Sequence, residues 1–400
     1  MEWIRLGDIA SKITKGTTPT SIGYDFIEDG INFVKVESIT ENRKFIPSKF
    51  AHISEECNEK LNRSQLKEND ILFSIAGVIG RTAIVHKDIL PANTNQALAI
   101  IRMPNGTIDY SFLAYALESP MVRKQYEKQQ QGVAQINVSL QNVGDFLIPR
   151  LELDEQHHIS ATLDKVSDLI AKRRAQLDKL DLLAKARFVE MFGDPILNPL
   201  EWPIKKLNDL SQLITNGNTP KGGSENYVSD GILFLRSQNV WRNRIDLDDV
   251  AFIDEATHAS MAKSSLHDKD ILITKTGRIN TENSSLGRAA LFRGEDNSAN
   301  INGHVYLVRL NDTVVPEYVV AILTGEPYRK YIRKVCVGGI DKRQINLDQV
   351  EDFPIILPPY EMQEQFAAFV GQTDKSKLTI QQCLDKLEIL KKALMQQYFG

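Results

Sequence analysis

The chain has 400 residues, 42% hydrophobic and 25% charged, which is the composition of a globular protein with more than one hydrophobic core. No run of eighteen apolar residues occurs, so the sequence predicts no membrane span, and its first residues lack the charged and apolar regions of a signal peptide. The net charge of −4 is not that of a strongly basic nucleic-acid binder, so any contact with nucleic acid must rest on local patches. Three scattered cysteines without metal-ligand spacing indicate a cytosolic protein with no bound metal and no disulfide framework.

Residues 154–192 carry a long periodic pattern. Asp154 suits a helix N-cap, Gly193 and Pro195 are stop signals, and no glycine or proline interrupts the stretch between them. Apolar residues recur at alternating steps of four and three, which predicts one helix of roughly 55–60 Å with a narrow apolar seam. The expected seam residues are Ile159, Leu163, Val166, Ile170, Leu177 and Leu180.

The end of the chain repeats this pattern over residues 361–399. A seam this narrow and this long is buried only by a partner of similar length, so we expect the two helices to pair as an antiparallel coiled coil. The alternative is two unrelated amphipathic helices, each packed on its own domain. The seam residues expected on the second helix are Phe366, Val370, Ile380, Leu384, Leu387 and Leu394.

An internal repeat organises the rest of the chain. Its first segment recurs at an offset of 201 residues (207 − 6), and glycines and prolines such as Gly16/Gly217 and Pro19/Pro220 keep that offset. A period near 200 residues is far too long for a solenoid, so the pattern indicates duplication of a whole unit with pseudo-two-fold symmetry. The matched segments are 6–19 with 207–220, 30–36 with 231–237, 69–77 with 269–277, and 95–102 with 302–309.

Each repeat reads as a mixed domain of the α+β class. Short apolar strands are separated by glycine-rich polar turns and followed by short helices near 110–126 and 318–331, which predicts a twisted, largely antiparallel sheet. The expected strands are 31–36, 71–75, 97–102, 232–236, 271–275 and 305–309. The expected boundaries are 1–150 for the first domain, 151–193 for the first helix, 194–357 for the second domain and 358–400 for the second helix.

The sequence contains little that would support an enzymatic activity. Residues 357–360 resemble the Asn/Asp-Pro-Pro-Tyr motif of amino-methyltransferases, but Leu357 cannot accept the hydrogen bond that the motif requires. There is no glycine-rich cofactor turn, no phosphate-binding loop and no nucleophile elbow. His157 and His158 are adjacent at a helix start, so they do not share a face as helical metal ligands do. We therefore expect a protein without catalytic residues, cofactor or metal.

Two matched turns carry small polar and basic side chains beside a glycine. Such turns let backbone N–H groups and short hydroxyls approach a phosphate, although they also occur as plain turns whose glycine and proline only set the geometry. The candidates at these turns are Lys15, Thr17, Thr18, Asn218 and Lys221.

A second set of candidates follows matched strands and lies in later loops. Arginine, glutamine and asparagine can make bidentate contacts with base edges, so the residues that end the matched strands are the preferred base readers. Those residues are Lys35, Ser38, Arg236, Gln238 and Asn239. Further candidates for DNA contact are Arg81, Gln135, Arg242, Arg244, Lys275, Arg278, Lys342 and Arg343. These polar loops diverge between the repeats while the framework is kept, so two similar domains could read two different targets.

This arrangement resembles the specificity subunit of Type I restriction–modification systems, and the resemblance covers the whole chain. Each motif alone is weak, but their order and double occurrence are specific. They are the paired segments 6–19 and 207–220, 70–77 and 270–277, Asn95-Gln and Asn302-Gly-His, and the helix entries 149–156 and 358–365.

The resemblance implies two target-recognition domains held apart by the helix pair, each reading half of a bipartite site in double-stranded DNA. It implies that the helix length sets the unread gap, that the helices dock two adenine-methylating subunits, and that motor–nuclease subunits join for cleavage. It also implies that this chain is not itself catalytic. A helix of roughly 55–60 Å exceeds one DNA turn of about 34–36 Å, as such a spacer requires. The alternative is a coiled-coil scaffold whose domains bind protein or glycan.

Overall fold

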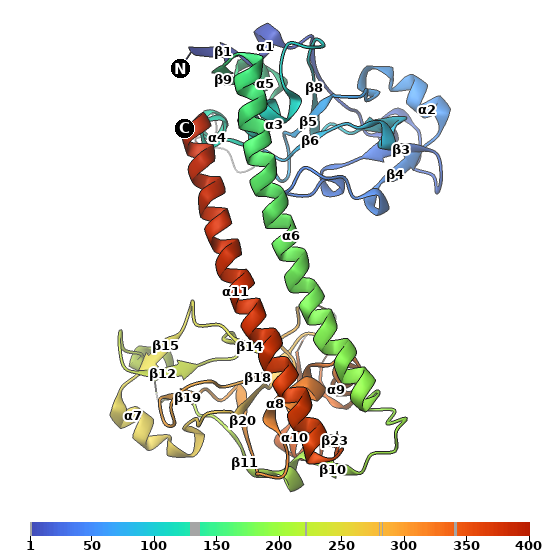
Figure 1. Cartoon of the computed structure of the whole chain (residues 1–400). Coiled ribbons are helices and arrows are strands. Elements are labelled where there is room, and N and C mark those ends of the chain that lie inside the picture. Colours follow the sequence, from blue (N-terminus) through green and yellow to red (C-terminus); the bar gives the residue numbers. More distant parts are fainter. Residues whose placement is uncertain (1, 129–136, 221, 280, 282, 340–341) are drawn as a thin grey trace. The chain divides into compact units, whose positions relative to one another are not determined.

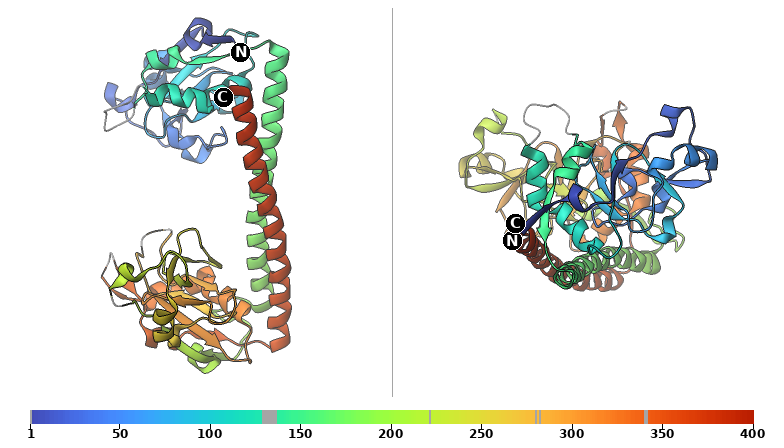
Figure 2. Two further views of the ribbon diagram at one scale, coloured as in Figure 1. Left: turned by 90° about the vertical axis from the view of Figure 1, so that its left-hand side faces the viewer. Right: turned by 90° about the horizontal axis from the view of Figure 1, so that it is seen from above.

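Two helices of 40 residues each, α6 (Leu153–Phe192) and α11 (Tyr360–Phe399), occupy the two regions with the heptad pattern (Figure 1). All twelve expected seam residues are buried or half-buried, whereas off-seam residues such as Leu182 and Ile389 are exposed. The left view in Figure 2 shows α6 and α11 alongside each other, and ion pairs join them in each unit. The expectation of a helix pair is therefore confirmed, and the alternative of two unrelated helices is wrong.

The computed structural model describes residues 2–128, 137–220, 222–279, 281, 283–339 and 342–400. The chain divides into two compact units, and each unit contains parts of both long helices. Unit 1 consists of Met1–Ala175 and Gln381–Gly400, and unit 2 of Gln176–Ile380. No helix among the described residues combines the length and the apolar content needed to cross a membrane.

In unit 1 the end of α11 packs against the first part of α6 and the domain beside it. Arg174 on α6 and Glu388 on α11 form an ion pair of 2.7 Å. Met395 and Phe399 enter the same buried cluster as Ile159, and the Phe399 ring lies 5.3 Å from that of Phe112. The helix pair is thus continuous with the hydrophobic core of this unit.

In unit 2 the start of α11 meets the end of α6, so the two helices run antiparallel. The Nζ atom of Lys377 lies 2.6 Å from the carboxylate of Asp181. The Phe366 ring lies 5.5 Å from that of Phe188 and 5.6 Å from that of Phe192. Aromatic edge contacts of this kind anchor the helix ends in the core more firmly than a coiled-coil seam alone would.

The sheets of unit 1 follow the predicted strands but form separate layers instead of one sheet. An antiparallel four-stranded sheet has the order β2 (Lys12–Lys15), β8 (Leu98–Arg102), β5 (Ile71–Ser74), β6 (Thr82–Ile84). A three-stranded sheet has the order β4 (Ala51–Ile53), β3 (Ile31–Val34), β7 (Ala92–Thr94), with β3 and β7 parallel. The third sheet has two strands, β1 (Glu2–Arg5) and β9 (Leu147–Arg150).

Unit 2 repeats the same three sheets. Their orders are β11 (Ser211–Asn216), β20 (Val305–Leu310), β16 (Ile271–Thr274), β18 (Ala289–Leu291); β15 (Ala251–Ile253), β12 (Ile232–Leu235), β19 (Ala299–Ile301); and β10 (Ile204–Lys206), β23 (Pro354–Ile356). Further pairings are β13 (Val240–Trp241) with β14 (Arg244–Ile245), and β17 (Thr276–Gly277) with β22 (Arg343–Gln344), which also pairs with β21 (Val337–Gly338).

Each region expected to be one short helix is two helices. Ser119 and Gly325 are extended between them. Ser119 directly precedes Pro120, which disfavours a helical conformation there, and Pro120 and Pro327 both lie in the first turn of the next helix, where a missing N–H is tolerated. The helices are α3 (Tyr110–Glu118), α4 (Pro120–Lys128), α8 (Pro316–Thr324) and α9 (Glu326–Val335).

The other α-helices are α1 (Leu6–Ile9), α2 (Glu55–Lys60), α5 (Leu140–Asp145), α7 (Glu255–Ser260) and α10 (Leu347–Glu351). The 3-10 helices are η1 (Pro19–Ile22), η2 (Val36–Ser38), η3 (Pro47–Lys49), η4 (Asn62–Ser64), η5 (Lys87–Ile89), η6 (Leu207–Leu210), η7 (Gly223–Asn226) and η8 (Ala262–Ser264).

A buried ion pair occurs at the same place in both repeats. The carboxylate of Asp70, at the start of β5, accepts two hydrogen bonds of 2.6 Å from Arg102 on β8. Asp270, at the start of β16, accepts hydrogen bonds of 2.9 and 2.7 Å from Arg309 on β20. Both aspartates are at most 1% exposed, so each bidentate pair fixes two neighbouring strands in the core.

We expect Asp270→Ala to lower the free energy of unfolding of unit 2 by about 3 kcal/mol, because it leaves the Arg309 charge without its buried partner. It also removes the acceptor for the backbone N–H of His267. Urea unfolding followed by circular dichroism measures the effect. Asp268→Ala removes the same charge from an exposed position and is the control. Equal stability of the two variants would contradict a role for the buried pair.

Candidate nucleic-acid interface

The matched polar turns after β2 and β11 are pressed against the backbone that leads into the neighbouring strand. A Cβ atom on Gly16 would lie 1.8 Å from the carbonyl oxygen of Thr94, and one on Gly217 would lie 2.1 Å from that of Ile301. Only glycine fits these two positions. The turns therefore have a fixed shape, with their polar side chains displayed around it.

The candidate side chains on these turns differ in exposure. Lys15 and Asn218 are exposed, whereas Thr17 and Thr18 are half-buried. Thr18 donates a hydrogen bond of 2.5 Å to the side chain of Gln96, so it also helps to hold the turn. Lys221 lies outside the described residues. Lys15 and Asn218 are consequently the two candidates on these turns that are most open to contact.

Ser38 and Asn239 require a correction, because both are buried and serve the fold. The Ser38 hydroxyl accepts the backbone N–H of Lys35 at 3.2 Å and donates to the Lys49 carbonyl at 3.0 Å. Asn239 accepts the N–H of Arg236 at 2.9 Å and donates to the Asp249 carbonyl at 2.8 Å. The two residues close matching loops in the two repeats. Their polar atoms are used internally, so we withdraw both from the set of base-reading candidates.

The other two candidates after β12 are held by one carboxylate. Arg236 donates to the backbone and side-chain oxygens of Asp249 at 2.8 and 3.1 Å, and Gln238 also donates to this carboxylate. The Asp249 side chain is 79% exposed, so the cluster lies at the surface. A base edge contacted by Arg236 or Gln238 would have to replace Asp249. Lys35, the counterpart of Arg236, instead has its Nζ 4.4 Å from the centre of the Phe26 ring.

Basic side chains gather around Trp241. The Arg288 guanidinium lies 3.9 Å from the centre of the indole ring, and that of Arg244 lies 5.3 Å away. Burial lowers the pKa of Arg288, and the positive charges of Arg242 and Arg244 lower it further. This cluster is therefore a region of positive potential, which favours an anionic partner.

Sequence reasoning missed Arg288, although the repeat contained the signal. Gly287-Arg288 is the copy of Gly80-Arg81 at an offset of 207 residues (288 − 81). Arg81 is half-buried and donates to the carbonyl oxygen of Ile39 at 3.1 Å. Each repeat thus holds an arginine at the same strand end, and in the second repeat this arginine lies over an aromatic ring that Arg244 also approaches.

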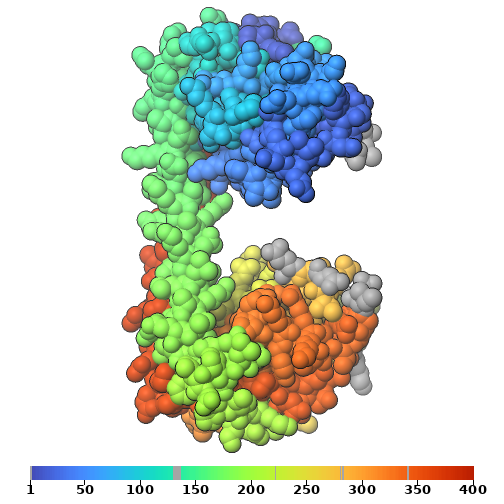
Figure 3. Space-filling view, turned by 90° about the vertical axis from the view of Figure 1, so that its right-hand side faces the viewer, coloured from blue at the N-terminus to red at the C-terminus, as the bar shows by residue number. Residues whose placement is uncertain are grey.

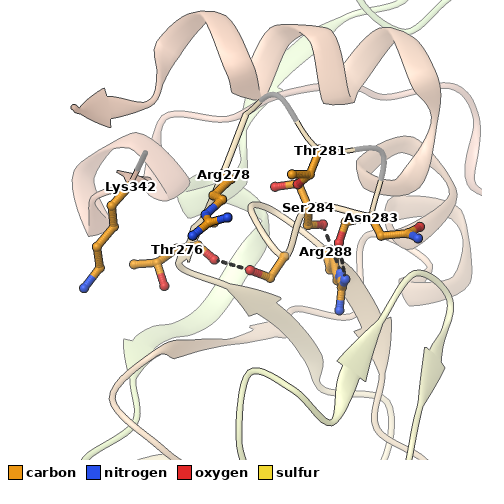
Figure 4. Close-up of a pocket in the computed structure, with 9 residues that line it drawn as sticks. Thr276, Arg278, Thr281, Asn283, Ser284, Arg288 and Lys342 are labelled. Atoms are coloured by element: carbon orange, nitrogen blue, oxygen red, sulfur yellow. Dashed lines mark hydrogen bonds between the residues drawn. The ribbon is translucent and has the colours of Figure 1, made fainter. Parts of the chain in front are cut away.

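A polar cavity of about 490 Å³ lies beside this cluster, between β17 and the segment that leads into β18 (Figure 4). Arg278, Arg288 and Lys342 contribute its positive charges. Lys275 is half-buried with its Nζ 5.6 Å from the Tyr306 ring. Arg343 is also half-buried and donates to the Cys336 carbonyl at 3.4 Å, so it serves the fold as well. Gln135 lies outside the described residues.

Comparison with known proteins identifies the family. The family model described as the Type I restriction modification DNA specificity domain matches residues 1–180 and 199–389, which is most of the chain and both repeats. The chain belongs to this family. As a member of the Type I specificity family, it carries the family domain twice, in agreement with the duplication seen in the sequence and in the sheets.

Individual relatives are distant. The Type I restriction enzyme EcoBI specificity subunit of Escherichia coli is 30% identical over 171 residues, covering 40% of this chain and 36% of that protein. The MjaX specificity subunit of Methanocaldococcus jannaschii is 25% identical over 202 residues, covering 50% of this chain and 46% of that protein. The chain thus aligns with less than half the length of these two relatives. The MjaIX specificity subunit of the same archaeon is 20% identical over 407 residues, covering 98% of this chain and 90% of that protein.

Two solved structures share the fold over the full length of this family member. The S subunit of a Type I restriction–modification system from M. genitalium covers 100% of this chain and 96% of its own, with a TM-score of 0.58 and 14% identity. A chain from a study of complex assembly and conformational transition of the type I R-M system covers 100% and 97%, with a TM-score of 0.57 and 17% identity. At these identities the likeness concerns the fold.

Proposed function

We propose that the chain is the sequence-specific DNA-recognition subunit of a Type I restriction–modification complex and is not itself catalytic. In this proposal the domains 1–150 and 194–357 each read one half of a bipartite site, and the helix pair sets the gap between the halves. The observation that carries it is the duplication. One framework, including the buried pairs Asp70–Arg102 and Asp270–Arg309, occurs twice, while the polar loops on it differ.

The long helices support docking of two copies of one partner. Leu182 and Leu183 on α6 are 62% and 49% exposed, and Ile389 and Leu390 on α11 are 68% and 45% exposed. The two pairs are related by the offset of the repeat, 207 residues (389 − 182). Figure 3 shows α6 at the surface of the molecule. Exposed aliphatic side chains in matched positions are typical of interaction sites, so we propose one methylation subunit at each pair.

The charge of the chain fits a dependence on partners. A net charge of −4 gives weak general attraction to DNA, so much of the phosphate contact must come from other subunits. Methylation subunits would supply both these contacts and the methyl transfer, and motor–nuclease subunits would join the complex for cleavage. The basic loops differ between the two repeats, which favours two DNA targets over the alternative of a scaffold that binds protein or glycan.

The test is DNA binding by the full chain, alone and with methylation subunits of a Type I system from the same organism. We expect the chain alone to bind duplexes weakly, and the complex to select one sequence from a random pool of duplexes at 0.15 M salt. Tight, sequence-specific binding by the isolated chain would contradict the dependence on partners. A complex that selects no sequence would contradict the recognition function.

A further inference from the structure

The two repeats differ in length at one place. Asp70 and Asp270 are 200 residues apart, whereas Asn95 and Asn302 are 207 apart, so the second repeat contains seven more residues (207 − 200) between these landmarks. The difference falls between β16 and β18, whose counterparts β5 and β6 are joined by a shorter connection. The longer connection lines the cavity described above. The cavity is therefore built by the sequence that the second repeat has added to the common framework.

The last part of the longer connection, residues 283–288, is held in place by hydrogen bonds. The hydroxyl of Ser285 donates to the Thr276 carbonyl at 2.7 Å, and that of Ser284 accepts the backbone N–H of Leu286 at 3.1 Å. A Cβ atom on Gly277 would lie 2.3 Å from the backbone nitrogen of Leu286, so this close approach requires glycine. The side chains around the cavity, drawn in Figure 4, therefore stand on a folded support.

Among the described residues that line the cavity, every charged side chain is basic. The buried Arg288 donates to the backbone carbonyl oxygens of Ser284, at 3.0 Å, and Asn283, which accept hydrogen bonds without supplying a negative charge. Arg278 and Lys342 are exposed at the rim. No ion pair joins any of these three cations to an acidic side chain within the part of the chain that the structure describes. The cavity thus offers an anion two exposed donors over a fixed positive charge.

The chemistry of the residues that line the cavity indicates whether it suits a phosphate or a base of a nucleic acid. The described ones are threonine, serine, asparagine, glycine, arginine and lysine, and none of these carries an aromatic or aliphatic side chain. Hydroxyl, amide and basic groups of this kind are the usual partners of phosphate oxygens. Base recognition in single strands usually involves stacking on aromatic side chains, and none of the described lining residues is aromatic. A volume of about 490 Å³ admits a phosphate together with its sugar.

We propose that this cavity binds one backbone phosphate of the DNA at the half-site read by the second domain. Arg278 and Lys342 contact the phosphate oxygens directly, Thr276 and Thr281 donate hydroxyl hydrogen bonds, and Arg288 supplies the charge beneath them. The seven added residues thereby fix the register of the second domain on the duplex without reading a base. This inference rests on the proposed recognition function and adds a specific site to it.

The experiment compares Arg278→Ala, Lys342→Ala and the double variant in the complex with the methylation subunits. Binding to the selected duplex, and to one with a mismatched second half-site, is measured from 0.05 to 0.3 M salt. We expect the double variant to weaken binding to both duplexes by the same factor, of the order of tenfold or more. The slope of log K against log salt should fall by about one, because one phosphate contact is lost. Lys263→Ala, which removes an exposed charge from the same domain outside the cavity, should leave affinity and slope unchanged.

Three results would overturn the assignment or its basis. Wild-type affinity and slope in the double variant would show that the cavity does not contact DNA. A changed base preference in the sequences that the double variant selects would show base reading instead of a phosphate contact. If the wild-type complex selects no sequence, the recognition function itself falls, which separates that failure from a failure of the cavity alone.

Discussion

A chain with one heptad inserted into each long helix is expected to recognise the same two half-sites across a longer gap. The insertions belong between Ala175 and Gln176 and between Ile380 and Gln381, at the boundaries of the two units along the chain. Seven residues at 1.5 Å each add about 10 Å, which equals at most about three base pairs at 3.4 Å per pair. Whole heptads keep the apolar seam facing its partner, so the pairing of α6 with α11 is preserved.

The insertion sites leave the polar contacts of each unit intact. Arg174 and Glu388 stay together in unit 1, and Asp181 and Lys377 stay together in unit 2. The measurement is selection of bound duplexes from a pool with random half-sites and random gap lengths. An insertion in one helix only is the control. It should abolish selection because one helix is then about 10 Å longer than the other, so the ends of both helices cannot keep their native contacts. Altered half-sites in the double insertion would show that the helix pair is not a spacer.

Replacing Leu182 and Leu183 by serine is expected to remove one of two methylation subunits from the complex. Complete burial of an exposed leucine contributes about 1.5–3 kcal/mol. Leu182 and Leu183 are 62% and 49% exposed, so loss of both side chains should weaken that site by at least about tenfold. The same change at Ile389 and Leu390 should remove the other copy, and the four-residue variant should bind none. Light scattering on the eluting complex gives the mass, and hence the number of subunits bound.

A matched control separates docking from general surface hydrophobicity. Leu197 is 80% exposed but lies in the connection after α6 and not on either long helix. Leu197→Ser should leave two methylation subunits bound. If the variant at Leu182 and Leu183 also retains two subunits, the matched aliphatic pairs are not the docking sites.

The elements of this fold were predictable from the sequence where one local pattern determined them. The helix boundaries follow from the heptad spacing and its stop signals, and the ends of β5 and β16 lie within one residue of the expected positions. The division of each domain into separate sheets could not be read, because strands of three or four residues carry too little alternation to reveal which partner they pair with.

The candidate site was harder to predict because the decisive contacts lie far apart in sequence. Ser38 and Asn239 resemble base readers, but each accepts a backbone N–H from three residues before it. Each also donates to a carbonyl oxygen 11 or 10 residues away, and that contact is not revealed by a local motif. Asp249 likewise holds Arg236 and Gln238 from beyond the next strand pair. A loop residue that can contact a ligand can equally close the loop.

The most direct test of the recognition proposal is a map of adenine methylation across the genome of the host strain, compared with a strain that lacks this gene. The proposal predicts methylation that depends on the gene and falls within two short specific blocks, separated by a gap of constant length and unspecified sequence. Methylation at one contiguous motif, or an unchanged pattern after deletion of the gene, would contradict it.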